Sequence, residues 1–355
     1  MGRASRRKTH DRPMQLVGTK AKPNSTITLQ NPVQDMFPAF IFGNALKCEA
    51  VVEPDSAAGQ HLILCGAGPS LAETAAAWCP KGDQVWGCNS ALIYLHEHGH
   101  QPTHGFTVDQ TAETLGEWAS TPDVEYLVAS TVHPHLVELL QGRGRRTRFF
   151  HNYVGIRRPP IQLDGEVMTY EDWLYQSLYP TTIRTGSGLN SVNRAIDLAI
   201  FMGFAKITVL GADCAMRFTS PPPPVPLGSP EHSAWMREEV TMHADGGHGL
   251  AANSTALTLW GQVDGREWLT KPDMIISAGW LEKTRQKWWP YSRPFEVLTE
   301  DERRAERAAG ERVGITGRVE LIGDTLPVAL KDKPDEYLQQ LPTMTDGDGN
   351  PMGWL

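Results

Sequence analysis

The chain has 355 residues, of which 40% are hydrophobic and 21% charged, and its formal net charge is −8 at pH 7. This composition predicts a folded globular protein, and Asp197 and Lys206 interrupt its most apolar long stretch, so no membrane span is expected. The negative charge argues against a general nucleic-acid-binding surface. The five cysteines form no C-x-x-C pair, and no apolar segment follows the basic N-terminus, which together predict a reduced, cytoplasmic protein.

Composition suggests four parts in chain order. Residues 1–58 form a basic arm and an apolar packing segment, and residues 59–217 a Rossmann-like nucleotide-binding domain. Residues 218–342 hold a proline-rich lid loop, a tryptophan-rich extension and a closing strand and helix, and residues 343–355 form a polar tail. The arm and the tail are predicted to be flexible, because neither carries a periodic apolar pattern.

The first strong pattern is HLILCGAGPSL, residues 61–71. Its apolar run predicts a buried parallel strand, and its glycines predict a tight turn into a helix. The free amides and the positive dipole end of a helix N-terminus attract phosphate. The sequence therefore predicts a phosphate-binding turn, and its residues are Gly66, Ala67, Gly68, Pro69 and Ser70.

The turn differs from two common phosphate-binding turns, those that bind dinucleotides and those of P-loop ATPases. A dinucleotide-binding turn carries Gly or Ala where Leu71 stands, and an acidic residue where Asn89 and Ser90 follow the next strand. A P-loop carries Gly-Lys-Ser/Thr, which is absent here. The pattern thus disfavours NAD and a Walker-type ATPase, and favours a nucleotide held by backbone amides together with Asn89 and Ser90.

Strands and helices go on alternating through the middle of the chain. The segment HGFTVD, residues 104–109, predicts a strand that ends in Asp109, and further strands are predicted at 124–130 and 148–152. This order predicts an α/β fold, a doubly wound and mostly parallel Rossmann-like sheet with insertions and a C-terminal extension. Gly66, Asn89 and Asp109 should then meet at the carboxyl edge of the sheet, where ligands bind.

A second glycine-serine turn precedes an amphipathic segment that ends near Gly203. The turn is Gly186, Ser187 and Gly188, and the strand after the segment leads to Asp213. The amides of this turn could hold a second phosphate. The alternative is that Ser187 only caps the helix.

The motifs GAGPSL, CNSAL, PTHGFTVDQ and GSGLNSVNRAIDLAIFMGFAKITVLGADC together resemble the MptE-like Rossmann proteins. That group includes archaeal 6-hydroxymethylpterin diphosphokinases and motility-associated glycosyltransferases. The layout is also similar to that of bacterial sialyltransferases, which use a CMP-sugar. The resemblance covers about residues 60–215, and its motifs are more specific for the fold than for the reaction.

The resemblance implies a nucleotide-dependent transferase acting on a small-molecule or glycan acceptor. In the preferred, diphosphokinase version, ATP lies along the first turn, and Asp109 and Asp213 hold a Mg²⁺ ion while the hydroxyl of a pterin-like acceptor attacks. In the glycosyltransferase version, the turn holds a CMP- or UDP-linked sugar, and Asp109 or His243 deprotonates the acceptor without an obligatory metal.

Two further alternatives remain at this point. His243 lies in a histidine- and glycine-rich stretch that could equally be an ordinary surface loop. The whole chain could be a non-catalytic scaffold that keeps the fold and offers its basic arm and tryptophans to partners. The sequence admits an oligomer and does not specify one.

Overall fold

The structure is a computed structural model of the chain, and it divides into two compact units. Unit 1 is Met1–Gln30, Asp213–Gly279 and Asp324–Leu355; unit 2 is Asn31–Ala212 and Trp280–Gly323. The residues that the structure describes are 15–16, 27–29, 34–110, 118, 122–156, 158–163, 165–179, 184–186, 189–215, 223–225, 229–231, 234–235, 259–263, 266–286, 318–331 and 344–346. The four-part division made from composition stays a prediction.

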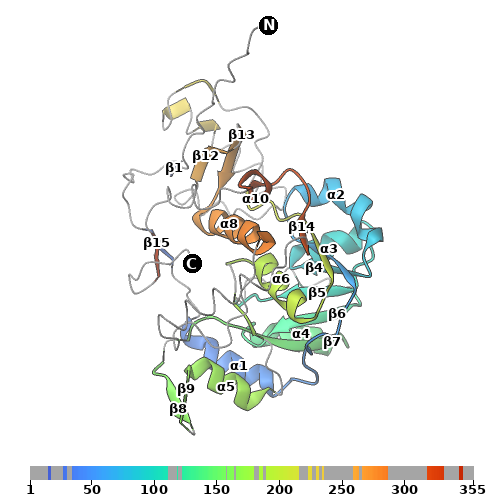
Figure 1. Ribbon diagram of the computed structural model, residues 1–355, viewed down its shortest axis with the longest axis vertical. Coiled ribbons are helices and arrows are strands. Elements are labelled where there is room, and N and C mark those ends of the chain that lie inside the picture. Colours follow the sequence, from blue (N-terminus) through green and yellow to red (C-terminus); the bar gives the residue numbers. More distant parts are fainter. Residues whose placement is uncertain are drawn as a thin grey trace. The chain divides into compact units, whose positions relative to one another are not determined.

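Unit 2 contains an eight-stranded, fully parallel sheet with the order β10-β7-β6-β5-β4-β3-β11-β14 (Figure 1). The strands are β3 (His61–Cys65), β4 (Gln84–Cys88), β5 (His104–Thr107), β6 (Glu125–Ala129), β7 (Arg146–Asn152), β10 (Arg184–Thr185), β11 (Lys206–Leu210) and β14 (Val319–Leu321). The chain runs outward from β3 to β10 and then returns to β11 on the other side of β3. The switch point of this doubly wound sheet therefore lies between β3 and β11, which confirms the predicted fold class.

Helices connect these strands, as expected for parallel pairs. They are α2 (Ser70–Trp78) with the 3₁₀ turn η2 (Cys79–Lys81), α3 (Ser90–Glu97), α4 (Pro134–Gly142), α5 (Tyr170–Leu178) and α6 (Ser191–Phe201). The hairpin β8 (Ile161–Leu163) and β9 (Glu166–Met168) precedes α5.

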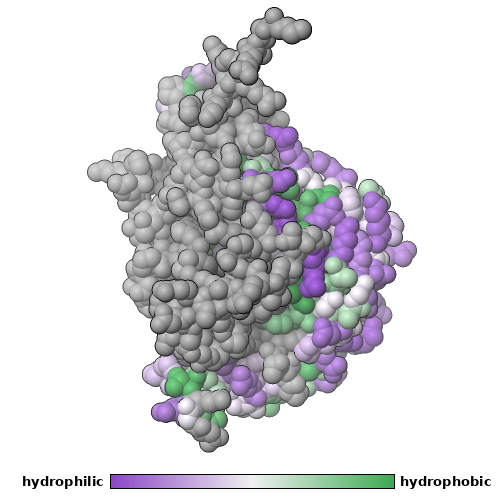
Figure 2. All heavy atoms as spheres, viewed as in Figure 1, coloured by the Kyte–Doolittle hydropathy of each residue, from purple (hydrophilic) through white to green (hydrophobic). Residues whose placement is uncertain are grey.

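The core of unit 2 lies along the strands of the sheet, which are buried on both faces. Strands β3, β4, β5 and β11 each bury every residue after the first. Trp86 stacks on Phe106 and meets Phe204 edge to face, joining β4, β5 and the turn before β11. Such continuous burial is typical of a parallel sheet covered by helices. Figure 2 shows mainly hydrophilic residues on the outer surface around α2 and α3.

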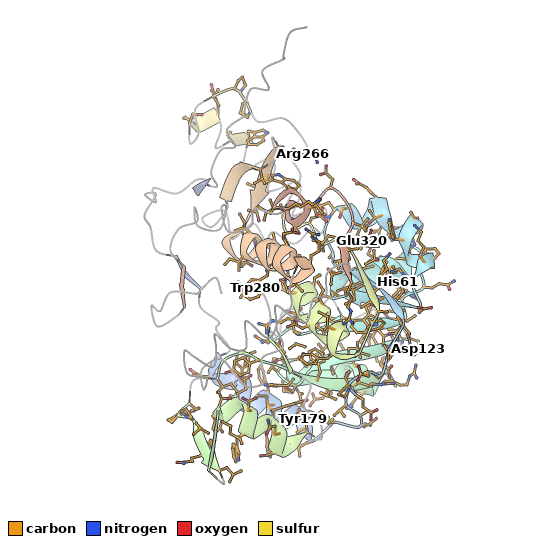
Figure 3. All side chains as sticks on the ribbon, in the orientation of Figure 1. His61, Asp123, Tyr179, Arg266, Trp280 and Glu320 are labelled. Atoms are coloured by element: carbon orange, nitrogen blue, oxygen red, sulfur yellow. The ribbon has the colours of Figure 1, made fainter. Side chains whose placement is uncertain are left out.

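The apolar segment before the main domain forms the short turn η1 (Gln34–Met36) and helix α1 (Phe37–Ala45), which packs against α4 and α5. Asn44 donates from Nδ2 to the carbonyl oxygens of Ser130 (3.0 Å) and Val132 (2.9 Å), just after β6. The hydroxyl of Tyr179, which follows α5 (Figure 3), donates to the carbonyl oxygen of Ile41 at 2.9 Å. These bonds tie α1 to the loop after β6 and to the end of α5.

Unit 1 contains a small antiparallel sheet in which β12 (Leu259–Val263) pairs with β1 (Gln15–Leu16) and β13 (Arg266–Thr270). Strands β2 (Ile27–Leu29) and β15 (Met344–Asp346) pair in parallel, and α10 is Leu326–Ala329. Helix α8 (Pro272–Gln286) begins in unit 1 and ends in unit 2. The predicted lid loop lies mostly outside the described residues. In the part of the chain that is described, no helix has the length and apolarity needed to cross a membrane.

Candidate functional site

The loops after β3 and β11 cross in close contact at the switch point. The amide of Gly66 donates to the carbonyl oxygen of Leu210, and the amide of Gly68 to that of Gly211, each at 2.8 Å. A Cβ atom at Gly66 would lie 2.6 Å from the Gly211 oxygen, and Gly211 itself has a φ of +61°. Both glycines are therefore required by the crossing of two backbones.

This geometry changes the interpretation of the predicted phosphate-binding turn. The amides of Gly66 and Gly68 are already bonded within the protein, Pro69 has no amide hydrogen, and the side chain of Ser70 is buried. Ala67 is exposed. The N-cap of α2 is Pro69, which makes no side-chain capping bond. This turn offers fewer free amides than the sequence suggests. Its role in holding a nucleotide stays a prediction.

Asn89 follows β4 and has an unusual backbone and side chain. Its φ of +50° and ψ of −126° are unfavourable for a residue with a Cβ atom, and such strain concentrates at functional sites. Its Nδ2 donates to the Ser191 hydroxyl at 3.2 Å, which brings the start of α6 to the end of β4. Its Oδ1 is buried and has no hydrogen-bond partner among the residues that the structure describes. An amide oxygen left in that state is costly unless a ligand donates to it. Ser90, the next residue, begins α3 and is half-buried.

Asp109 lies just beyond the carboxyl end of β5 and is half-buried. Its amide donates to the Thr107 hydroxyl at 3.1 Å, and its carbonyl oxygen accepts the amide hydrogen of His133 at 3.3 Å. Gly66, Asn89 and Asp109 thus follow the neighbouring strands β3, β4 and β5 and lie at the carboxyl edge of the sheet, as predicted. Their roles stay predictions.

His133 caps α4 beside Asp109, and sequence reasoning missed it. Its Nδ1 accepts the amide hydrogen of His135 at 3.3 Å. Burial, and then the neighbouring His135, lower the pKa of His133, which favours a neutral ring with its proton on Nε2. The pattern HPHLVELL indicates a helix start, but only the order of the strands shows that this start lies at the same edge as Asp109.

The second predicted turn needs one correction. Helix α6 begins at Ser191, and its cap is Asn190, whose side chain accepts the amide hydrogen of Asn193 at 2.9 Å. Ser187 is therefore not the cap of this helix, because it lies four residues before the first helical residue. Ser187 and Gly188 fall outside the described residues, and the amide of Gly186 donates to Asp197 Oδ2 at 3.2 Å.

A buried polar chain stands at the ends of β6 and β7. The Ser130 hydroxyl lies 2.8 Å from His151 Nδ1, and His151 Nε2 lies 3.0 Å from Glu171 Oε1, which is within ion-pair distance but lacks hydrogen-bond geometry. All three side chains are fully buried. The Glu171 carboxylate also accepts the amide hydrogens of Val154 (2.8 Å) and Ile156 (2.9 Å), which fixes the loop after β7. The three residues come from separate elements, so no motif in the sequence announces them.

The remaining predicted residues are less well placed for the roles assigned to them. Asp213 belongs to unit 1, is 2% exposed, and accepts the amide hydrogen of Leu326 with its carbonyl oxygen at 3.1 Å. His243 lies outside the described residues. Among the described residues, no group of three or more His, Cys, Asp and Glu side chains is arranged to hold a metal ion. A magnesium site at Asp109 and Asp213 stays a prediction.

Comparison with known proteins adds the family. Residues 45–218 match the family described as 6-hydroxymethylpterin diphosphokinase MptE-like. No curated protein matches the sequence at a significant level. Among solved structures, the MAf glycosyltransferase from Magnetospirillum magneticum AMB-1 is similar, with 13% identity and a TM-score of 0.45 over 85% of this chain and 44% of that one. The chain thus spans less than half the length of that glycosyltransferase.

The family match supports a transferase-type activity, and it coincides with the part of the chain that carries the glycine crossing, Asn89 and Asp109. Residues 45–218 are thus similar to the MptE-like family, as the motifs in this part of the chain indicate.

Proposed function

We propose that unit 2 is a nucleotide-dependent transferase that moves a group from a bound nucleotide to the hydroxyl of a small-molecule or glycan acceptor. The observation that carries this proposal is the buried, unpartnered Oδ1 of the strained Asn89, held against Ser191 at the ligand-binding edge of a doubly wound sheet. A ribose hydroxyl or a base amino group would supply the missing donor.

The roles divide along the sheet edge. Asn89 and the first turn of α6 bind the donor nucleotide, whose phosphate gains from the positive end of the helix dipole. Asp109, one strand further on, accepts the proton of the acceptor hydroxyl as the new bond to oxygen forms. The donor's bond to its phosphate breaks at the same time, and the electron pair leaves with the phosphate oxygen.

One structural observation favours glycosyl transfer from a nucleotide-sugar. The amides of Gly66, Gly68 and Gly186 all donate within the protein, so these three amides are not available to a polyphosphate such as ATP. A sugar nucleotide with a single phosphate, of the CMP type, needs the fewest. This proposal reverses the preference drawn from the sequence, which was for the diphosphokinase version.

ATP-dependent diphosphoryl transfer is the second candidate, and the description of the matched family favours it. It requires Mg²⁺ to neutralise the phosphates, and Asp109 is the described residue best placed to contribute. The two candidates therefore differ in their nucleotide and in their need for metal.

Calorimetric titration of the full chain with CMP, UDP, UDP-sugars and ATP, each with and without Mg²⁺, tests both. Tight binding of CMP or UDP without metal supports glycosyl transfer, whereas binding of ATP only with Mg²⁺ supports the diphosphokinase. Asn89→Ala should weaken the affinity for the nucleotide by about tenfold. Gln162→Ala, at an exposed position of β8, should leave the affinity unchanged.

Turnover with a bound nucleotide then separates enzyme from scaffold. Asp109→Asn keeps the size of the side chain and removes the base. It should therefore abolish product formation and leave nucleotide binding intact. A wild-type chain that binds none of these nucleotides would refute the proposed function and favour the scaffold alternative.

A further inference from the structure

Arg194 lies in the first turn of α6, three residues after Ser191 and thus on the same face of the helix. Ser191 accepts a hydrogen bond from Asn89, after β4, while Arg194 donates from Nη1 to the carbonyl oxygen of Tyr153, after β7, at 2.9 Å. The first turn of α6 therefore bridges two strand ends, and β5 with Asp109 lies between those strands in the sheet.

The guanidinium group keeps most of its donors unused. Arginine has five N–H donors, and the bond to Tyr153 is the hydrogen bond that Arg194 makes among the described residues. The residue is only half-buried, so solvent reaches it. Partial burial lowers the pKa of Arg194. A guanidinium with free donors that solvent can reach is able to bind a carboxylate or a phosphate.

The neighbouring carboxylates do not use these donors. Asp197 and Glu171 are the charges that raise the pKa of Arg194 against burial, and so keep it protonated. Asp197 accepts the Gly186 amide, and Glu171 accepts two amides after β7 and faces His151. Among the described residues neither carboxylate lies within ion-pair distance of Arg194, so the guanidinium fork is left for a ligand.

We propose that Arg194 binds an oxyanion of the ligand in this site, either the phosphate of the nucleotide or a carboxylate of the transferred or accepting sugar. This inference rests on the proposed function and adds a binding residue to it. The planar guanidinium matches both anions in a two-point contact. Tyr153, fixed through the loop that Glu171 holds, keeps the fork in place before the ligand arrives.

The test is calorimetry at constant salt on four full-length proteins: wild type, Arg194→Met, Arg194→Lys and Arg146→Met. Arg146 is an exposed arginine at the amino end of β7 and serves as the matched control. The ligands are CMP and cytidine, UMP and uridine, ATP and adenosine, inorganic phosphate, pyrophosphate and glucuronate. Thermal unfolding of each variant checks that it folds, and Arg194→Lys keeps the charge if Arg194→Met does not fold.

If the phosphate is the anion, Arg194→Met should weaken binding of the nucleotide by about tenfold to a hundredfold and leave the nucleoside unchanged. Arg194→Lys should fall between, and Arg146→Met should behave as wild type. If a carboxylate is the anion, the loss should appear with glucuronate and not with the nucleotide. Equal affinities of wild type and Arg194→Met for all ligands overturn the inference.

The failure of the proposed function gives a different result. If no nucleotide binds to the wild type, the anion site is tested by the titrations with phosphate, pyrophosphate and glucuronate. Binding of one of them that is lost in Arg194→Met supports the anion site without a nucleotide enzyme, and no binding of any anion to the wild type overturns it.

Discussion

Gly211→Ala should be among the most damaging single substitutions in unit 2, because Gly211 is where the β11 loop crosses the β3 loop. An added Cβ would overlap the carbonyl oxygen of Gly66 and lie 2.9 Å from Leu71 Cβ, where carbon atoms normally approach to about 3.5–4.0 Å. The loops would have to separate, and the bond from the Gly68 amide to the Gly211 oxygen would lengthen.

Three contributions set the expected size of the effect. Placing alanine at a φ of +61° costs about 1–2 kcal/mol. Overpacking at the crossing costs about 1–3 kcal/mol, and the weakened hydrogen bond adds about 1 kcal/mol. The free energy of unfolding should therefore fall by about 3–6 kcal/mol. Since each kcal/mol lowers the Tm of a domain this large by about 2–4 °C, the shift should be easily measured.

Gly144→Ala is the matched control, because Gly144 has a φ of +71° and no atom within 4 Å of an added Cβ. Its free energy of unfolding should fall by only the backbone contribution of about 1–2 kcal/mol. Urea denaturation of both variants and of wild type measures the difference. Equal destabilisation by the two substitutions would refute the reasoning, since it would mean that the crossing tolerates a side chain.

Three other substitutions test the rest of the site. Asn89→Gly relieves the backbone strain at φ +50°, so thermal unfolding should show unchanged or higher stability while calorimetry shows weaker nucleotide binding; a stable variant with full affinity would contradict the role of Asn89. Glu171→Gln leaves the buried chain at His151 with mismatched donors and should lower the free energy of unfolding by about 2–4 kcal/mol in urea, and no loss would show that the chain adds nothing. Burial, opposed by Glu125, lowers the pKa of His104 from its usual 6.5, so the unfolded chain takes up the proton first as the pH falls and the folded state loses stability below about pH 6.5. His104→Gln should make urea stability between pH 7 and 5 less steep, and an unchanged slope would contradict this assignment.

The sequence predicted the sheet well because a buried parallel strand has a strong local pattern. Residues 61–65, 84–88 and 206–210 are short apolar runs followed by turns, and the structure makes each of them a strand. Parallel connection then brings Gly66, Asn89 and Asp109 to one edge without further information.

What the sequence could not predict depends on partners that are distant in the chain. A glycine turn looks like a phosphate site until the Gly68 amide is found on the Gly211 oxygen, 143 residues later in numbering. The chain from Ser130 to Glu171 and the place of His133 beside Asp109 likewise need the strand order. Local pattern therefore gave the residue types of the site, and only tertiary contacts show which of their polar atoms remain free.

Several polar groups at the amino edge of the sheet are paired, whereas two residues at the carboxyl edge are candidates for contacts to a ligand. At the amino edge, the His61 amide donates to Asp83 at 2.8 Å, His61 Nε2 lies 2.9 Å from the Thr208 hydroxyl, and Lys206 pairs with Glu320 at 3.1 Å. At the carboxyl edge, Asn89 is strained and its buried Oδ1 has no partner among the described residues, and the half-buried Arg194 makes a single hydrogen bond to them. A nucleotide with its phosphate would supply both a donor for Asn89 and an anion for Arg194.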